Sequence, residues 1–187
     1  KIPTPPYVDG RDISSADYQT LYTKHLGSVA APTAGFHFTT DLLTRIDALG
    51  VRRAFVTLHV GVGTFRPIKT ATLEAHAMHA EWAQLPEATA TAILETQAHG
   101  GRVIAIGTTS VRVLESFDGR AGEGWTNLFI QPNHQFHVVD ALLTNFHLPK
   151  STLLVLVSAF AGHERVLQAY EHAIDHGYRF YSFGDAM

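Results

Sequence analysis

Three ionisable side chains lie in or beside segments that have the pattern of a strand running into a polar turn. His59 ends an apolar run that starts at Val56, and Gly61 follows it. Asp140 lies inside another such run, and His147 follows that run in a Thr-Asn-Phe-His turn. An imidazole exchanges protons near neutral pH, so a histidine placed in this way is suited to acid–base catalysis. A hydrogen-bonded core side chain explains each residue alone, but the recurrence at strand ends favours a shared site.

A second group of candidate residues could bind an anion. The segment from Gly107 to Arg112, with the sequence Gly-Thr-Thr-Ser-Val-Arg, follows an apolar run and precedes a helical pattern. Free backbone N–H groups at a helix start favour a carboxylate or a phosphate, and the three hydroxyls add donors. The lysine of a nucleoside-triphosphate loop is absent, and Thr109 or Ser110 could equally be a simple helix cap. The segment therefore predicts either an anion site or an ordinary capped helix.

Two loops carry residues that could approach a ligand closely. Gly61 and Gly63 form half of a dinucleotide fingerprint, but Arg66 occupies the place of the third glycine and no helical pattern follows. This excludes a Rossmann nicotinamide site, although the glycines still allow either close approach of the backbone to a ligand or a tight turn. In the loop that starts at Pro32, His37 lies between two phenylalanines. A planar base could stack on those rings, and core aromatics beside a loop are the alternative.

Composition excludes several classes of protein. The chain has 187 residues and no cysteine, so it contains no disulfide framework, thiolate metal site or cysteine nucleophile. Its formal charge of −3 gives no global basic field, so a nucleic-acid partner would need a local patch or another domain. No apolar run is long enough to cross a bilayer, no membrane partner is expected, and a cytoplasmic location fits.

His76 and His79 could begin a metal site, because they lie three residues apart with Glu81 nearby. Their spacing is not the His-Glu-x-x-His signature of metalloproteases. Two histidines that pack or hydrogen bond on a half-buried segment explain the pattern more simply. A metal-dependent hydrolase built on this pair stays open as an alternative function.

Periodicity and capping residues predict the elements that must position these side chains. Helices are expected over residues 17–25, 41–49, 87–99, 110–117, 151–161 and 164–176. Strands are expected over residues 53–60, 81–85, 102–106, 128–130, 138–143 and 179–183, and a glycine-rich turn region over residues 118–125. Because strands alternate with helices and the first strand is nearly continuously apolar, the sequence predicts a layered α/β domain with a largely parallel sheet. Residues 1–15 are expected to be a linker into that domain, which takes up residues 16–187.

Several segments together resemble one family. They are residues 31–39 (APTAGFHFT), 57–67 (TLHVGVGTFRP), 76–79 (HAMH), 107–112 (GTTSVR), 139–149 (VDALLTNFHLP) and 181–187 (YSFGDAM). In this order, over nearly the whole chain, they resemble the S-adenosylmethionine:tRNA ribosyltransferase-isomerase family of queuosine biosynthesis. Residues 131–136 (QPNHQF) depart from the Tyr-Pro-Gly-Tyr version common in that family, which is a local difference.

The resemblance implies a distinctive reaction. S-adenosylmethionine would be a co-substrate that donates its ribosyl group, and no metal would be needed. The acceptor would be the aminomethyl group of 7-aminomethyl-7-deazaguanine at the wobble position of tRNA, and the products epoxyqueuosine-tRNA, adenine and methionine. Members of the family carry an α/β domain and a β-barrel domain and are longer than this chain. The chain is then expected to be a monomer that represents the carboxyl-terminal portion of the α/β domain without the barrel.

The resemblance also implies roles for the candidate residues. His59 and His147 are expected to transfer protons, with Asp140 orienting a partner or accepting a proton. The remaining candidates are expected to bind the two substrates: Thr33, Gly35, His37, Gly61, Gly63, Thr64, Phe65, Thr108, Thr109, Ser110, Arg112, Asn145 and Lys150. A non-catalytic nucleotide-binding module, which would bind without turnover, is a second alternative beside the metal-dependent hydrolase.

Overall fold

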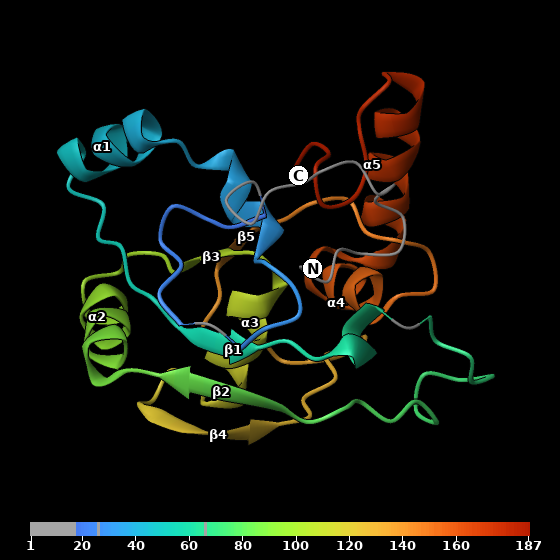
Figure 1. Cartoon of the computed structure of the whole chain (residues 1–187), viewed down its shortest axis with the longest axis horizontal. Helices are drawn as coiled ribbons and strands as arrows, with labels where there is room; N and C mark the ends of the chain where they lie inside the picture. Colours follow the sequence, from blue (N-terminus) through green and yellow to red (C-terminus); the bar gives the residue numbers. More distant parts are fainter. Residues whose placement is uncertain (1–17, 26, 66) are drawn as a thin grey trace.

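The computed structural model describes residues 18–25, 27–65 and 67–187, and within these ranges helices alternate with strands (Figure 1). This confirms a mixed α/β architecture. In chain order the elements are η1 (Thr33–His37), α1 (Thr40–Ala48), β1 (Thr57–His59), η2 (Val62–Phe65), β2 (Glu81–Leu85), α2 (Glu87–Ala98), β3 (Ile104–Ile106), α3 (Thr108–Ser116), β4 (Gly122–Thr126), β5 (Ala141–Leu143), α4 (Thr152–Ala161) and α5 (His163–Asp175).

The strands β1, β2 and β4 form one antiparallel sheet, with β2 in the middle. Successive side chains of a strand point to opposite faces of the sheet. Leu58 and Leu85 are buried on the face that packs into the core. The register places His59, Trp82 and Trp125 in a row across the three strands. This row lies on the opposite face, away from the core.

The strands β3 and β5 form a second sheet, and they are parallel. The backbone N–H of Gly107 donates to the carbonyl of Leu143 at 2.8 Å, which continues the pairing to the ends of both strands. Parallel strands end at the same edge of a sheet, where α/β proteins collect their ligand-binding residues. The polar segments that begin at Thr108 and Thr144 therefore leave the sheet side by side.

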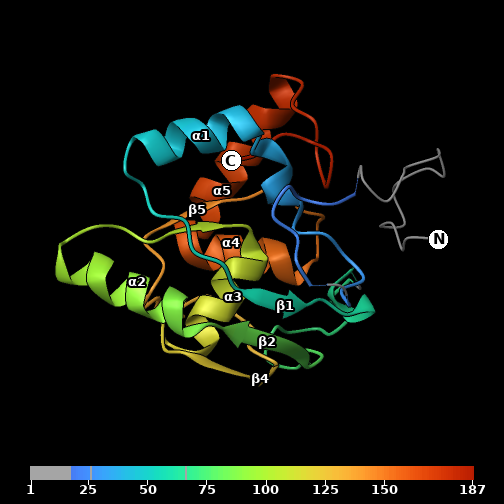
Figure 2. The same cartoon turned by 60° about the vertical axis from the view of Figure 1, so that its left-hand side comes forward.

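The helix α3 lies between the two sheets, where it contacts β1 and β2 on one side and β3 on the other (Figures 1 and 2). Its Val111 and Val113 are fully buried. The pair α4 and α5 packs beside α3. Ser151 caps the start of α4, as the sequence predicts, and its hydroxyl accepts a hydrogen bond from the N–H of Leu154 at 3.2 Å. Thr39 caps α1 in the same way through the N–H of Leu42.

The core is continuous across the elements and consists mainly of β-branched and leucine side chains. Its members include Leu58, Val60, Leu85, Ile93, Val111, Val113, Ile130, Val139 and Leu156. Over the described residues, no helix combines the length and the apolar character that a bilayer crossing requires.

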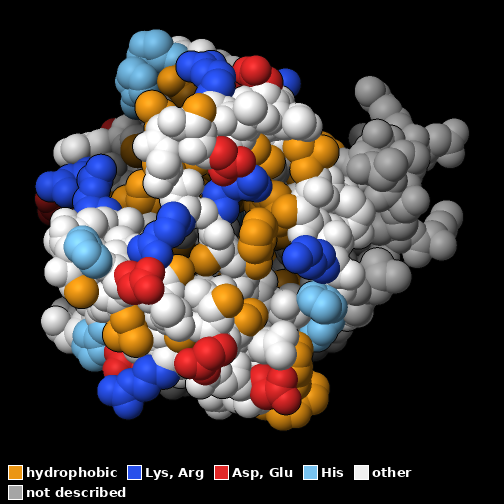
Figure 3. All heavy atoms as spheres, turned by 90° about the vertical axis from the view of Figure 1, so that its left-hand side faces the viewer, with side chains coloured by type: hydrophobic (Ala, Val, Ile, Leu, Met, Phe, Trp, Pro, Cys, Tyr) orange, Lys and Arg blue, Asp and Glu red, His pale blue; other side chains and the backbone are white. Residues whose placement is uncertain are grey.

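The face that carries α1 and α2 mixes acidic and basic side chains with exposed hydrophobic ones (Figure 3). One ion pair there joins Arg53 to Asp47 at 2.7 Å, and another joins Arg52 to Glu95. Leu49, which directly follows α1, is 80% exposed. Since the charges of the described residues on this face largely compensate each other, it lacks the excess of cations with which proteins bind nucleic acid.

The sheet arrangement differs from the sequence-based expectation. Parallel pairing is confined to β3 and β5, so the prediction of a largely parallel sheet is wrong for the three antiparallel strands. Residues 118–125 were expected to be a turn region because glycine is depleted in strands, but residues 122–126 form β4 along the whole of β2. The strand expected over residues 53–60 is confined to residues 57–59, since residues 53–55 are exposed and unpaired with the sheet.

Three other expected elements are absent from the described residues. Residues 18–25, 128–130 and 179–183 form turns or extended segments instead of the expected helix and strands. Near the carboxyl end, the N–H of Arg179 donates to the carboxylate of Asp185 at 2.7 Å, which folds this segment into a turn. The expected linker over residues 1–15 lies outside the described residues.

Candidate active site

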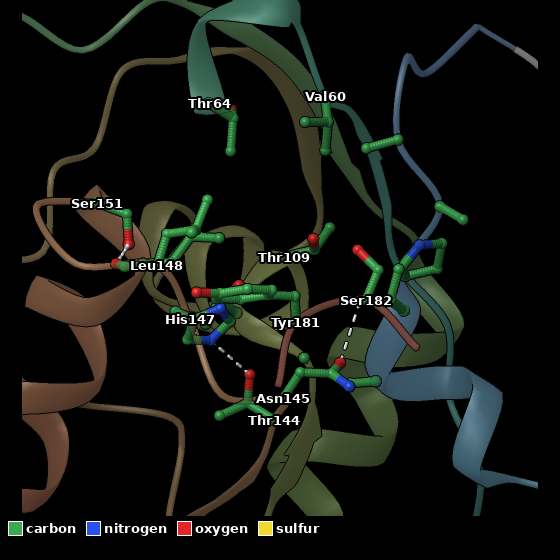
Figure 4. A pocket seen from close by; sticks show the side chains of 18 of the residues that line it. Val60, Thr64, Thr109, Thr144, Asn145, His147, Leu148, Ser151, Tyr181 and Ser182 are labelled. Atoms are coloured by element: carbon green, nitrogen blue, oxygen red, sulfur yellow. Dashed lines mark hydrogen bonds between the residues drawn. The ribbon is translucent and has the colours of Figure 1, made fainter. Parts of the chain in front are cut away.

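A cavity of about 880 Å³, open to solvent, lies beside the carboxyl ends of β3 and β5 (Figure 4). This volume includes the solvent-filled mouth of the cavity. The η1 turn, the end of β1, the start of α3, the segment after β5 and the residues after α5 all contribute to its walls. Seven sequence-predicted site residues line it: Thr33, Thr64, Thr108, Thr109, Arg112, Asn145 and His147.

His147 lies on the cavity wall in a tightly held turn. Its backbone N–H donates to the hydroxyl of Tyr170 at 2.6 Å, and that hydroxyl donates to the carbonyl of His147 at 3.2 Å. The ring Nε2 is 2.9 Å from the hydroxyl of Thr144. Burial lowers the pKa of the His147 imidazole to about 4, because the charged form loses its water. The ring is therefore neutral at physiological pH and hydrogen bonded on one side.

Asn145 forms a second polar group on the same segment. Its side chain is buried, with 3% of the residue exposed. The hydroxyl of Thr33 donates to Oδ1 of Asn145 at 3.1 Å, and Nδ2 lies 3.2 Å from Nε2 of His37. An amide N–H₂ can only donate, so His37 accepts through Nε2 and carries its ring proton on Nδ1. His37 therefore lies one hydrogen bond behind the cavity wall, which it supports through Asn145.

The cation of the site is Arg112, on the first full turn of α3. It is 4% exposed and forms a buried ion pair with Glu81, which is 2% exposed. Its Nε donates to the carbonyl of Leu128 at 3.3 Å. Its Nη2 has no hydrogen-bond partner within the described part of the chain. Arg112 is among the residues that line the cavity, and its unpartnered Nη2 is itself buried in this structure.

The start of α3 adds backbone donors to the same wall. No side chain caps this helix, whose N-cap Gly107 has a φ of 85° and a ψ of 152°. That conformation is essentially open only to glycine, so the sharp turn from β3 into α3 depends on this residue. Thr108 and Thr109 follow in the wall. The uncapped helix start leaves backbone N–H donors at this end of the cavity, beside the Arg112–Glu81 ion pair, in which the two charges compensate each other.

His59 and Asp140 do not join His147 at the cavity. Leu58 and Val60 line the cavity, so the alternation along β1 turns His59 to the outer face, where its ring packs on Trp82 at 5.4 Å between centroids. Asp140 is exposed at the start of β5, the end remote from the cavity, and accepts from the N–H of Val103 at 2.7 Å. The structure thus separates the three residues that were expected to act together.

Other candidates support the walls from behind. Gly35 is buried next to Tyr22, and a Cβ atom at Gly35 would lie 2.1 Å from the Tyr22 hydroxyl. The N–H of Gly61 donates to Glu81 at 2.7 Å. The hydroxyl of Ser110 donates back to the carbonyl of Ile106 at 2.8 Å.

Three further candidates lie in loops. Gly63 gives space to the ring of His79, which a Cβ atom would approach to 2.0 Å. Lys150 is exposed, and its carbonyl accepts from the N–H of Ile68 at 2.8 Å. Phe65 belongs to η2, and its side chain lies outside what the structure describes. Gly63 and Lys150 are not among the described residues that line the cavity.

The histidine pair considered for a metal is explained by packing. The ring of His76 lies edge-on to Phe129 at 5.3 Å, and that of His79 packs on Gly63. Within residues 18–25, 27–65 and 67–187, no three His, Asp or Glu side chains gather as a metal site.

The cavity also contains residues that sequence patterns did not indicate. Tyr181 and Ser182 line it, and Figure 4 shows Tyr181 at the same side as His147. Tyr181 has a φ of 70°, an uncommon conformation for a bulky residue that is enriched at functional sites. The only available signal was its place in the segment that resembles the family. Glu81 contacts Arg112, and Tyr170 contacts His147. Nothing in the local sequence of Glu81 or Tyr170 indicates these supporting contacts.

Comparisons with known proteins agree with this architecture. A family model described as queuosine biosynthesis protein matches residues 1–187. An S-adenosylmethionine:tRNA ribosyltransferase-isomerase from Cupriavidus metallidurans is 56% identical over 194 residues, which cover 100% of this chain and 55% of that protein. The crystal structure of an S-adenosylmethionine tRNA ribosyltransferase from Thermotoga maritima matches with a TM-score of 0.69 and 44% identity, over 82% of this chain and 50% of that chain. The chain thus spans about half the length of these relatives.

Proposed function

Because the chain belongs to the queuosine biosynthesis protein family, we propose that it supplies the S-adenosylmethionine site of an S-adenosylmethionine:tRNA ribosyltransferase-isomerase. The proposed reaction transfers and isomerises the ribosyl group of S-adenosylmethionine onto 7-aminomethyl-7-deazaguanine at the tRNA wobble position. Its products are epoxyqueuosine-tRNA, adenine and methionine. The family match favours this function over a metal-dependent hydrolase or a non-catalytic nucleotide-binding module.

The observation that supports the proposal best is the set of hydrogen-bond donors at one end of the cavity. The unpartnered Nη2 of Arg112 and the uncapped start of α3 are suited to the methionine carboxylate of the donor. The hydroxyls of Thr108 and Thr109 on the same wall are suited to that carboxylate or to ribose hydroxyls. Thr64 of η2 lies on the wall and is suited to contact the adenosine part. A cavity with hydrogen-bond donors gathered at one end fits an amino acid carboxylate joined to a nucleoside.

We assign proton transfer to His147 and leave His59 and Asp140 out of the proposed site. The sulfonium of the donor acidifies the adjacent 5′ carbon, from which a base can remove a proton. A histidine with a low pKa is neutral and can accept this proton at physiological pH. Thr144 holds the ring through Nε2, and Tyr170 holds the backbone of the turn. The adenine leaving group and the incoming amine would then meet on the side of the cavity lined by Tyr181.

The remaining parts of the proposal concern the whole protein. We propose that this chain is the carboxyl-terminal portion of the α/β domain and acts with the rest of a longer polypeptide, as a cytoplasmic monomer. Since the described face over α1 and α2 has compensated charges, contacts to tRNA are assigned to other surfaces or to the remaining polypeptide. S-adenosylmethionine is a co-substrate in this scheme, and the reaction proceeds without a metal.

A turnover assay on the full-length protein tests the proposal. S-adenosylmethionine and tRNA bearing the aminomethyl-deazaguanine are incubated without added metal, and adenine, methionine and the modified nucleoside are followed by mass spectrometry. All three products should appear together. His147→Asn should lower turnover by roughly 10²–10⁴-fold while tRNA binding is retained. The exposed His99→Asn is the matched control and should keep full activity.

Two outcomes would reject the proposal. Well-folded protein that binds tRNA but releases no adenine would indicate a binding module. Product that forms only after addition of zinc or manganese would favour the alternative function, a metal-dependent hydrolase. Full turnover in His147→Asn would leave the reaction class intact and reject only the role of His147.

A further inference from the structure

Glu81 is a buried carboxylate whose two oxygens hold separate parts of the cavity wall. One oxygen, Oε2, pairs with Nη1 of Arg112 on α3. The other, Oε1, accepts from the N–H of Gly61 and from the hydroxyl of Thr64, each at 2.7 Å. With 2% of its surface exposed, Glu81 has little contact with water and depends on these partners.

The position of Glu81 follows from the alternation along β2. Glu81, Ala83 and Leu85 are buried on the inner face of the strand, and Trp82 points outward. Glu81 therefore takes a core position between α3 and the turn at residues 61–65. A charged residue in such a place needs full hydrogen bonding, and this side chain has it.

We propose that Glu81 is a positioning residue that fixes the anion-binding group of Arg112 and the turn at residues 61–65 relative to each other. This inference rests on the proposed function, because it concerns how the same cavity recognises S-adenosylmethionine. Both ends of the link belong to the wall: Arg112 and Thr64 line the cavity, whereas Glu81 lies behind it. Glu81 touches no substrate and acts through its partners.

The hydrogen bonds define what Glu81 does to Arg112. A guanidinium has five N–H donors in a rigid fork, and fixing some of them fixes the direction of the others. Nη1 is held by Glu81 and Nε by the carbonyl of Leu128, so the plane of the group is set and Nη2 is left over. The arrangement leaves Nη2, which is buried in this structure, as the donor that we assign to a ligand carboxylate. Since Nη1 is occupied by Glu81, a bidentate contact through Nη1 is excluded.

Glu81 also joins two parts of the ligand site that are distant in sequence. Arg112 is suited to the carboxylate of the donor and Thr64 to its adenosine part. If Glu81 fixes the spacing between them, it sets the distance between the two ends of the ligand that the cavity accepts. Its loss should then reduce the preference for a donor that carries a carboxylate, and should affect donor affinity more than the chemical step.

The test uses the full-length protein and two compounds, S-adenosylmethionine and its decarboxylated analogue. Dissociation constants are measured by isothermal titration calorimetry for the wild type, Glu81→Gln and Glu81→Asp. In Glu81→Gln an amide N–H₂ replaces one oxygen, so the side chain cannot accept from both ends of the link. Glu81→Asp retains the charge but is one methylene too short to reach both ends. Each variant should weaken S-adenosylmethionine binding about tenfold or more and lower the preference over the analogue by a similar factor.

Glu123→Gln is the matched control, since Glu123 lies on the neighbouring strand β4, is exposed and pairs with Gln84. It should keep both dissociation constants. Turnover at saturating S-adenosylmethionine should fall less than about threefold in the Glu81 variants, because a positioning role for donor binding leaves the bound reaction largely intact. The melting temperature of each variant establishes that the comparison concerns folded protein.

Each outcome decides the inference. Glu81→Gln or Glu81→Asp with the wild-type preference for the carboxylate would overturn it, as would tighter binding of S-adenosylmethionine by Glu81→Gln. Binding lost only in Glu81→Gln and kept in Glu81→Asp would overturn it as well, because the charge alone would then matter. A wild-type protein that binds neither compound would reject the proposed function itself. Wild-type binding with an unaltered preference in the variants rejects only the role of Glu81.

Discussion

Replacing Arg112 by methionine should destabilise the protein strongly, because it removes one member of a buried ion pair. Methionine keeps most of the volume of the arginine stem, so the change leaves little empty space. Glu81, which is 2% exposed, would retain its charge without its cation. The main effect is then the unpaired buried carboxylate and not a packing defect.

The size of the effect can be estimated from the hydrogen bonds. Removing one partner from a buried ion pair costs about 3–5 kcal/mol of unfolding free energy. Glu81 keeps two donors, the N–H of Gly61 and the hydroxyl of Thr64, so a value near the lower end, about 3 kcal/mol, is expected. For a domain of this size that corresponds to a drop of roughly 6–12 °C in melting temperature.

The double variant Glu81→Gln/Arg112→Met separates charge from packing. With both charges removed, no ion remains buried, and the loss relative to the wild type should be only about 1–2 kcal/mol. The double variant should therefore be more stable than Arg112→Met alone. Differential scanning calorimetry of the full-length wild type, both single variants and the double variant gives the coupling between the two positions.

Two results would refute this reasoning. A melting temperature of Arg112→Met within about 2 °C of the wild type would mean that the carboxylate of Glu81 does not depend on Arg112. A double variant less stable than Arg112→Met would mean that packing, and not the unpaired charge, dominates the loss.

Three further predictions follow from the caps and from the low pKa of His147. The unfolded chain takes up the His147 proton near pH 6.5 but the folded protein only near pH 4, so this residue contributes stability above pH 6.5 that is lost as the pH falls toward 4. At roughly 1.4 kcal/mol per pKa unit, the loss of unfolding free energy is at most about 3 kcal/mol. His147→Asn should therefore weaken the pH dependence of the unfolding free energy measured with urea, whereas the exposed His99→Asn should leave it unchanged. Gly107→Ala should lower the free energy of unfolding by about 1–3 kcal/mol, because alanine is strained at the positive φ of this position. A steric clash does not add to this cost, because the new Cβ would meet Ala34 at an ordinary 3.5 Å. A wild-type melting temperature of the variant would argue against this strain. Ser151→Ala should cost about 1 kcal/mol by removing the cap of α4, whereas Ser151→Asp should retain stability, as thermal denaturation would reveal.

The helices could be predicted well from the sequence because their signals are local. Thr39 and Ser151 cap α1 and α4 through neighbours three residues away, and Gly100 follows the end of α2. These contacts depend only on short stretches of chain. Helix starts and stops are therefore visible without knowledge of the fold.

Strand direction and side-chain orientation depend on partners far away in the chain. The glycines of β4 suggested a turn, and only the pairing with β2 makes that segment a strand. Whether His59 faces the cavity depends on the register of β1, since a shift of one residue turns every side chain to the other face. The recurrence of polar turns after strands predicted a shared edge, and β3 and β5 end together at such an edge, where His147, Asn145 and Thr108 line the cavity; their roles stay predictions.

The groups that support the site had no local signal at all. Glu81 and Arg112 lie 31 residues apart, and Tyr170 reaches His147 across 23 residues. Each partner is ordinary in its own segment: an acidic residue at the start of a strand, and a tyrosine on an amphipathic helix. Only the folded chain brings them to the wall, so these residues could be found only from the structure.

The cross-strand pair of Trp82 and Trp125 gives the protein an optical reporter. These are the two tryptophans of the chain, and they face each other across β2 and β4 on the side of the sheet opposite the cavity. A ligand in the cavity cannot quench them by direct contact with their rings. Glu81, however, directly precedes Trp82 in the chain and is hydrogen bonded to Arg112 and to Gly61. If ligand binding displaces Arg112 or residues 61–65, Glu81 moves with them, and its chain neighbour Trp82 moves as well. A change in their fluorescence on addition of a ligand would consequently report movement of β2 and not occupancy alone.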